Sequence, residues 1–120
     1  MTHVQKETAQ LLKEKGFDLP CRQFYDGNVG MGSQENNPVN WNKYDDVYSS
    51  PTLHEATDWL RETKGVHVQV GTYHYNVGVY YWESTVVEIE DGKYHQVGMF
   101  DTHDLALEAG IVHALKHYVK

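Results

Sequence analysis

The sequence Gly65-Val66-His67-Val68-Gln69-Val70 decides the fold, because a helix-type pattern ends at its glycine and a strand-type pattern begins after it. The valines alternate with polar residues, so one side of the chain is apolar and the other is polar. This alternation is typical of a half-buried β-strand. We therefore expect a strand at residues 66–70, directly after a helix.

The residues before this strand predict the helix. Ser50 is a suitable N-cap residue, and Pro51 fits the first helical position, where its missing N–H removes no hydrogen bond. Gly65 ends the helix. The apolar residues between these points recur at helical spacing and predict a buried stripe of Leu53, Ala56, Trp59 and Leu60.

The residues after the first strand predict two more strands and a final helix. A turn at residues 75–78 leads to a β-rich run at 79–90, and Asp91-Gly92 is a two-residue hairpin signal before a third strand at 93–100. Thr102 is the expected N-cap of the last helix. Its expected buried arc is Leu107, Ile111, Ala114, Leu115 and Tyr118, and the expected solvent arc is His113, Lys116, His117 and Lys120.

The first 49 residues predict smaller elements. Residues 2–15 carry an amphipathic pattern that ends at Gly16, after which Phe17 is expected to pack back on Leu12. A weak hairpin is expected at residues 23–31, with its turn at Asp26-Gly27-Asn28. The polar residues 34–43 predict a long surface loop that Trp41 anchors.

Together these elements predict a single domain over residues 1–120, of the α+β class. Three antiparallel strands joined by tight turns have one face to bury, and helices at both ends of the series can cover it. We expect a two-layer sandwich, with helices on one face of a three-stranded antiparallel sheet. Residues 50–120 form its α-β-β-β-α core, and residues 1–49 supply the N-terminal helix, hairpin and loop. This order is similar in topology to the double-stranded-RNA-binding-domain fold.

A more specific resemblance rests on three stretches, at residues 7–18, 50–68 and 100–111. They resemble a group of short proteins of unknown function from gut bacteria of the Bacteroidetes type and from their phages or mobile elements. The matching motifs are helix caps and core stripes, so no catalytic or binding residue is carried over. The resemblance implies a cytoplasmic accessory protein.

Charge argues against a nucleic-acid partner. The chain has 17 acidic and 10 basic residues, a net charge of −7 with its eight histidines neutral. A duplex-binding surface needs clustered Lys and Arg. The last helix would have to present basic residues to phosphates, but it begins Asp101-Thr102-His103-Asp104. We expect no binding of double-stranded nucleic acid.

Other classes of function are also disfavoured. No apolar run approaches the roughly 20 residues of a membrane span, and the first residues lack the apolar stretch of a signal peptide. We therefore expect a cytoplasmic protein without a membrane partner. Cys21 is the only cysteine, which excludes an internal disulfide and a cysteine-based metal cage. No cofactor is expected.

The histidines offer weak candidates for chemistry. His113 and His117 lie one helical turn apart and could supply two zinc ligands, but no glutamate stands beside His113 as in a metalloprotease helix. The favoured interpretation places both on the solvent side of the helix. If Tyr94 and Gln96 face outward, His95 points inward, and Glu83 or Glu88 could form an acid–base pair with it across strands. No residue is assigned as catalytic.

The aromatic residues give the stronger lead. Alternation places Tyr80 and Trp82 on one sheet face and Tyr81 on the other, so some rings fall on a face that no helix covers. Exposed aromatic rings on a sheet are typical of a partner surface. The alternative is that the N-terminal hairpin or the first helix covers them. The candidate partner-binding residues are Tyr73, Tyr75, Tyr80, Tyr81 and Trp82.

The sequence therefore favours a small non-enzymatic binding or protein-interaction module, with a protein partner or a second copy of itself. Two alternatives stay open. One is an acidic component of toxin–antitoxin type, or a host-interfering protein that occupies a basic partner. The other is a small histidine-dependent hydrolase or nuclease.

Overall fold

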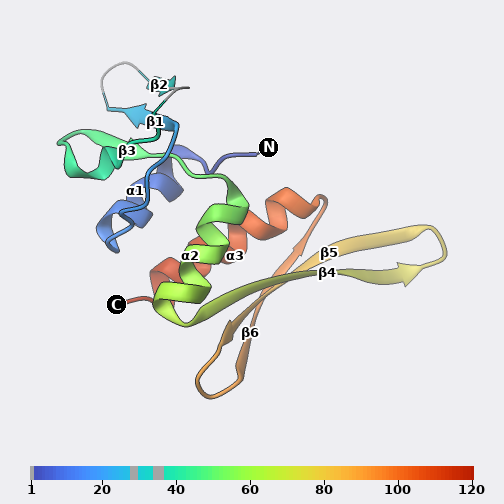
Figure 1. The fold of residues 1–120 in the computed structure, drawn as a ribbon. Helices are drawn as coiled ribbons and strands as arrows, with labels where there is room; N and C mark the ends of the chain where they lie inside the picture. The colour runs from blue at the N-terminus through green and yellow to red at the C-terminus, as the bar shows by residue number, and fades with distance from the viewer. Residues whose placement is uncertain (1, 28–29, 34–36) are drawn as a thin grey trace. The chain divides into compact units, whose positions relative to one another are not determined.

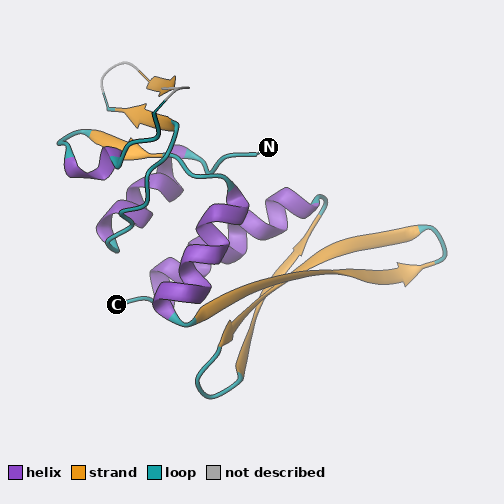
Figure 2. Ribbon diagram, in the orientation of Figure 1, coloured by secondary structure: helices purple, strands orange, loops and turns teal. Residues whose placement is uncertain are grey.

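The structure is a computed structural model that describes residues 2–27, 30–33 and 37–120 (Figure 1). It has the α+β composition that the sequence predicts, with helices and antiparallel strands in both halves of the chain (Figure 2). The chain divides into two compact units, Met1–Ala56 and Thr57–Lys120, which are described separately.

The first unit contains helix α1 (Lys6–Glu14) and a small antiparallel sheet. Strand β1 (Gln23–Asp26) lies between β2 (Gly30–Ser33) and β3 (Val47–Ser49). The pairing of β1 with β2 confirms the predicted hairpin, although Asp26, predicted in its turn, pairs with Gly30 at the end of β1. Strand β3 was not expected. Asn28 of the predicted turn and residues 34–36 of the predicted loop lie outside the described residues.

Helix α1 is shorter than the amphipathic pattern predicts, because it starts at Lys6. Its predicted ending is confirmed. Gly16 has a φ of 93°, the Phe17 N–H donates to the Leu12 carbonyl at 3.0 Å, and the Gly16 N–H donates to the Lys13 carbonyl at 3.1 Å. These two bonds form a Schellman motif, which places the buried Phe17 next to the end of the helix.

Trp41 anchors its segment, as predicted. It begins the 3₁₀ helix η1 (Trp41–Lys43), its Nε1–H donates to the Cys21 carbonyl at 2.8 Å, and its ring centroid lies 4.2 Å from that of Phe24. The segment around Trp41 is thereby held against β1.

Helix α2 (Leu53–Lys64) begins two residues later than predicted, so the assignment of Ser50 as its N-cap is wrong. The Glu55 N–H donates to Thr52 Oγ1 at 3.1 Å, and the Thr52 N–H donates to Glu55 Oε1 at 2.9 Å. This capping box satisfies two backbone donors at once, which is more than Ser50 can do alone. Ser50 is buried instead.

The second unit contains a three-stranded antiparallel sheet with helix α3 (His103–His117) packed on one face. Strand β5 (Val79–Glu88) lies between β4 (Val66–Asn76) and β6 (Lys93–Phe100). Strand β4 continues well past the predicted end at Val70. The predicted two-residue hairpin at Asp91-Gly92 is wrong, because Glu88 pairs with Lys93 and residues 89–92 form a four-residue loop.

The core of this unit lies between α3 and the sheet. Thr102 caps the helix as predicted, since its Oγ1 accepts from the Leu105 N–H at 3.1 Å. Gly110 faces the sheet closely: a Cβ at this position would collide with Val68 Cγ1 and would lie 2.6 Å from Ser84 Oγ. The buried residues of the sheet and helix are Val66, Val68, Ser84, Val86, Ala106, Leu107, Gly110, Ile111, Ala114 and Leu115.

We expect Gly110→Ala to lower the free energy of unfolding by about 1–3 kcal/mol, because the added methyl group must push α3 away from the sheet. Gly71→Ala is the matched control, since a Cβ at Gly71 meets no atom within 4 Å. The control should leave stability unchanged or raise it by up to about 1 kcal/mol. Urea denaturation followed by circular dichroism measures both, and equal effects of the two substitutions would contradict the close packing at Gly110.

Candidate functional site

The most distinctive feature of the second unit is a two-stranded extension of its sheet. Pairing between β5 and β6 stops where Trp82 lies opposite Phe100, but β4 and β5 continue to pair beyond this point. We call the extension, residues Tyr73–Tyr81, the arm (Figure 1). It turns at Val77-Gly78, where Gly78 has a φ of 77°.

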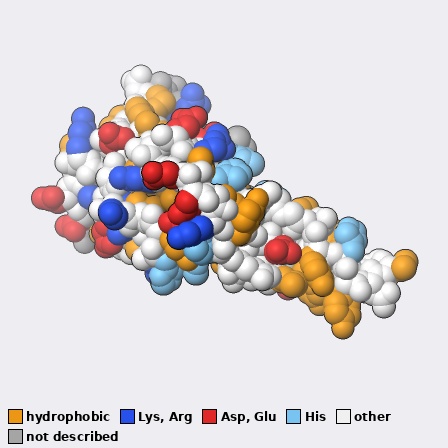
Figure 3. Space-filling view, turned by 90° about the horizontal axis from the view of Figure 1, so that it is seen from below, with side chains coloured by type: hydrophobic (Ala, Val, Ile, Leu, Met, Phe, Trp, Pro, Cys, Tyr) orange, Lys and Arg blue, Asp and Glu red, His pale blue; other side chains and the backbone are white. Residues whose placement is uncertain are grey.

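Every residue of the arm is exposed. Tyr75 is 76% exposed and Val77 at the tip is 99% exposed, whereas Val66, Val68 and Val86 in the same sheet are buried. No Asp, Glu, Lys or Arg occurs between Gly65 and Trp82. Hydrophobic side chains consequently gather along the arm (Figure 3). Its large exposed side chains are Tyr73, Tyr75, Val77, Val79, Tyr80 and Tyr81.

The register confirms the predicted faces of the aromatic residues. Tyr73 lies opposite Tyr81 on one face, and Tyr80 lies opposite His74 on the other. On the second face, the Tyr80 ring makes an edge contact with the Trp82 ring, and the two ring centroids are 6.1 Å apart. Trp82 is only half exposed, unlike the four candidate tyrosines.

Trp82 is the candidate that the fold partly covers. Its ring makes an edge contact with the ring of His103, with centroids 5.2 Å apart, at the start of α3. Sequence reasoning missed His103, because the contact depends on where α3 begins relative to the sheet. Trp82 thus joins the arm to the helix-covered part of the unit.

The face of the sheet opposite α3 carries a shallow hollow of about 480 Å³. Gly71 lies at this hollow, where the missing side chain leaves open space. The side chains around it are mostly uncharged and polar, with one carboxylate. The main lining residues are Gln69, Gly71, Glu83, Thr85, Tyr94 and Gln96.

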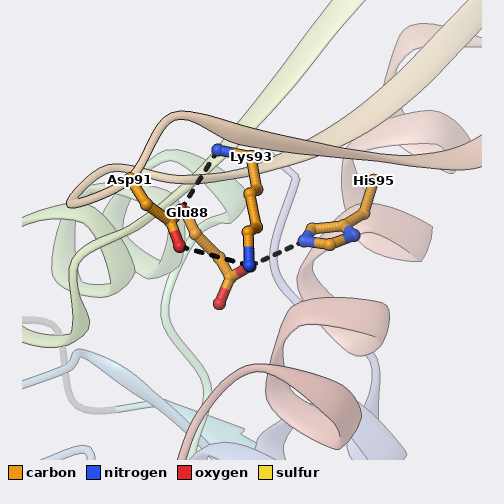
Figure 4. Close-up of polar contacts among 4 residues, drawn as sticks. All are labelled: Glu88, Asp91, Lys93 and His95. Carbon is orange, nitrogen blue, oxygen red and sulfur yellow. Dashed lines mark hydrogen bonds and ion pairs between the residues drawn. The ribbon is translucent and has the colours of Figure 1, made fainter.

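His95 points toward α3, as predicted, and it pairs with Glu88 rather than Glu83. Its Nε2 lies 2.7 Å from Glu88 Oε2 (Figure 4), and its ring stacks on Tyr118 with centroids 4.1 Å apart. Glu83 borders the hollow on the other face of the sheet. The contacts of His95 tie β6 to β5 and to the end of α3.

His113 and His117 lie next to this pair. Their ring centroids are 4.6 Å apart, and the His113 ring lies 5.6 Å from that of Tyr118. His113 is half-buried, so its predicted place on the solvent side of α3 is wrong, whereas His117 is exposed. Tyr118, the residue after the last turn of α3, lies against His95 of β6, and His113 lies five residues earlier in the chain.

Metal binding would require further ligands beside these two histidines. Within residues 2–27, 30–33 and 37–120, no group of three or more His, Cys, Asp or Glu side chains is arranged to hold a metal ion. The remaining strand histidines lie apart, because His67 pairs with Val87, His74 with Tyr80, and His95 with Val86. His67, His74 and His95 therefore do not converge on one site.

Burial lowers the pKa of His113 below the ordinary value of 6.5, and the nearby His117 and His95 lower it further. The unfolded chain therefore takes up this proton at a higher pH than the folded chain. It follows that the free energy of unfolding decreases as the pH falls from above 6.5 through the lowered pKa of His113.

We expect His117→Gln to raise the pKa of His113 toward its ordinary value, because one neighbouring positive charge is removed. Nuclear magnetic resonance titration of the imidazole protons measures this shift. The exposed His54, in the first unit, supplies the control His54→Gln, which should leave the His113 titration unchanged. An unchanged His113 pKa in His117→Gln would contradict the arrangement at the end of α3.

Cys21 is buried in the first unit. Burial raises the pKa of its thiol to about 12, the negative charge of Glu55 adds to the effect, and a hydrogen bond with Ser49 opposes it. Because the thiolate is the reactive form, the thiol of the folded chain has little nucleophilic character at neutral pH.

We expect Cys21 to react with Ellman's reagent at neutral pH only after the first unit has unfolded. The native chain should show no fast release of thionitrobenzoate, and addition of guanidinium should release it at once. Fast labelling of the native chain would show that the thiol is accessible.

Comparisons with protein-family models, with curated proteins and with solved structures found no match to the chain. None of the helices in the described ranges is long and apolar enough to cross a membrane.

Proposed function

We propose that the chain is a protein-interaction module and that the arm, Tyr73–Tyr81, is its binding element. The observation that carries the proposal is that the arm exposes six large apolar or aromatic side chains and no charged one. Soluble proteins rarely leave such side chains grouped at the surface unless a partner covers them.

The composition of the arm supports a protein as that partner. Tyrosine is enriched in protein interfaces and charged residues are depleted from their centres. Tyrosine also buries a large area at a small cost in side-chain entropy, because it has few rotatable bonds. Four tyrosines on a short hairpin, with Asn76 and Gly78 at the turn, fit this composition.

The same composition disfavours the competing functions. Phosphate groups would meet no Lys or Arg between Gly65 and Trp82, and α3 starts with Asp104 in its first turn. An acidic toxin–antitoxin-type component would need carboxylates on its binding surface, and the arm has none. A histidine-dependent hydrolase would rely on His95, which the Glu88 contact and the Tyr118 stack explain as a structural residue.

A cytoplasmic location belongs to the same proposal, as does an origin in gut bacteria or their mobile elements. Both rest on the three stretches at residues 7–18, 50–68 and 100–111, which resemble short proteins of such bacteria.

The proposal is tested by site-specific photo-crosslinking. A benzophenone amino acid at position 75 should crosslink the chain to a defined protein in living cells, whereas the same amino acid at position 94 should not. Tyr94 is a matched control, because it is 71% exposed and Tyr75 is 76% exposed, but Tyr94 lies on β6 outside the arm.

The crosslinked protein is then purified and its affinity measured by calorimetry. We expect the double substitution Tyr75→Ser and Tyr80→Ser to weaken binding about tenfold or more, as for aromatic side chains at interface centres. Tyr94→Ser should leave the affinity unchanged. Crosslinking at position 94 but not at 75, or no loss of affinity in the double variant, would refute the arm as the binding element.

A further inference from the structure

We infer that the partner of the arm is a second copy of this chain, and that strand β4 pairs antiparallel with β4 of that copy across a two-fold axis at Gly71. This inference rests on the proposed function and specifies it. The result would be a continuous six-stranded sheet, with α3 of each copy on the same face.

The outer edge of β4 lacks the features that normally prevent such pairing. Strand β4 is an edge strand, since in the described part of the chain it pairs with β5 alone. Natural edge strands carry charges, prolines or bulges that block a further strand. From Val66 to His74, β4 has no charge, no proline and no irregularity in its register, and a bulge appears only at Tyr75.

The arm has only two strands, because β6 does not extend alongside it. A two-stranded hairpin alone is marginally stable in water, and a third strand is needed to make it robust. The third strand, β6, ends at Phe100, where the arm begins. Antiparallel pairing of β4 with its copy supplies that strand, because the arm of one copy then lies along the sheet-backed part of the other.

The position of the axis follows from the length of the strand. Gly71 is the middle residue of β4 (Val66–Asn76), so an axis there gives the longest overlap. In this register Gln69 lies opposite the partner's Tyr73, and Val70 lies opposite the partner's Thr72. Because Gln69 borders the hollow, the ring of the partner's Tyr73 would lie at its rim.

Charge permits this contact although the whole chain is acidic. A net charge of −7 on each copy opposes association in general. The residues that would meet across the axis, Val68–His74, carry no acidic side chain, so no like charges are brought into direct contact. A strongly acidic or basic partner would find no complementary charge on this strand. A second copy presents the same uncharged strand, so pairing with it leaves no charge unpaired.

The register is tested by charge exchange, with sedimentation velocity as the measurement. Wild-type chain should be a dimer at micromolar concentration. The double variant Gln69→Lys and Tyr73→Lys places like charges opposite each other twice across the axis, as does Gln69→Glu with Tyr73→Glu. Each variant alone should dissociate about tenfold or more readily than wild type. An equimolar mixture of the two should restore the dimer.

The control variant carries Tyr94→Lys and Gln96→Lys on β6, the opposite edge of the sheet, and should remain a dimer. Far-UV circular dichroism confirms that each variant is folded, and recovery in the mixture shows that the two double variants are competent. A monomeric wild-type chain, dimers that survive the charged substitutions, or a mixture that does not associate would each overturn the inference.

The outcomes for the two proposals can be told apart. If the wild-type chain is monomeric but position 75 crosslinks to a different protein, the self-pairing is wrong and the arm remains the binding element. If the β6 control is the variant that loses the dimer, the self-pairing through β4 is wrong, and the crosslinking at position 75 decides separately whether the arm is the binding element.

Discussion

The second unit depends on the close approach of α3 to the sheet at Gly110. The glycine has no side chain, so the helix backbone comes down onto Val68 and Ser84, and the larger side chains on either side, such as Leu107 and Ile111, are fully buried. A helix of this length covers only a limited part of a sheet, because it advances about 1.5 Å per residue while a strand advances about 3.3 Å. What α3 covers is the part of the sheet that has three strands.

The candidate binding surface therefore lies on the part of β4 and β5 that α3 does not cover. Within the three-stranded part, Val66, Val68, Ser84 and Val86 face α3 and are buried. In the arm, β4 and β5 continue without either a helix or a third strand, and all their side chains are exposed. On the face that α3 covers, β5 changes from the buried Val86 and Ser84 to the half-exposed Trp82 and the exposed Tyr80, which matches the change from an interior to a surface that suits a partner.

Most of the local structure could be predicted from the sequence, because caps and alternation act over a few residues. The ending of α1 at Gly16, the cap at Thr102 and the faces of Tyr80 and Tyr81 are examples. Pairings between distant residues could not be predicted. Strand β3 has only three residues and is held by β1, and His113 approaches Tyr118 and His95 only because of how α3 lies on β6. The cap at Thr52 was missed although Thr52-Leu53-His54-Glu55 carries the capping-box spacing.

The uncharged arm has a consequence for proteolysis. Trypsin cleaves after Lys and Arg, and none lies between Lys64 and Lys93, so the whole β4–β5 hairpin offers it no site. Chymotrypsin cleaves after aromatic residues and finds exposed ones at Tyr73, Tyr75, Tyr80 and Tyr81. Any molecule that covers the arm would thus protect these four tyrosines from chymotrypsin while leaving digestion by trypsin unchanged.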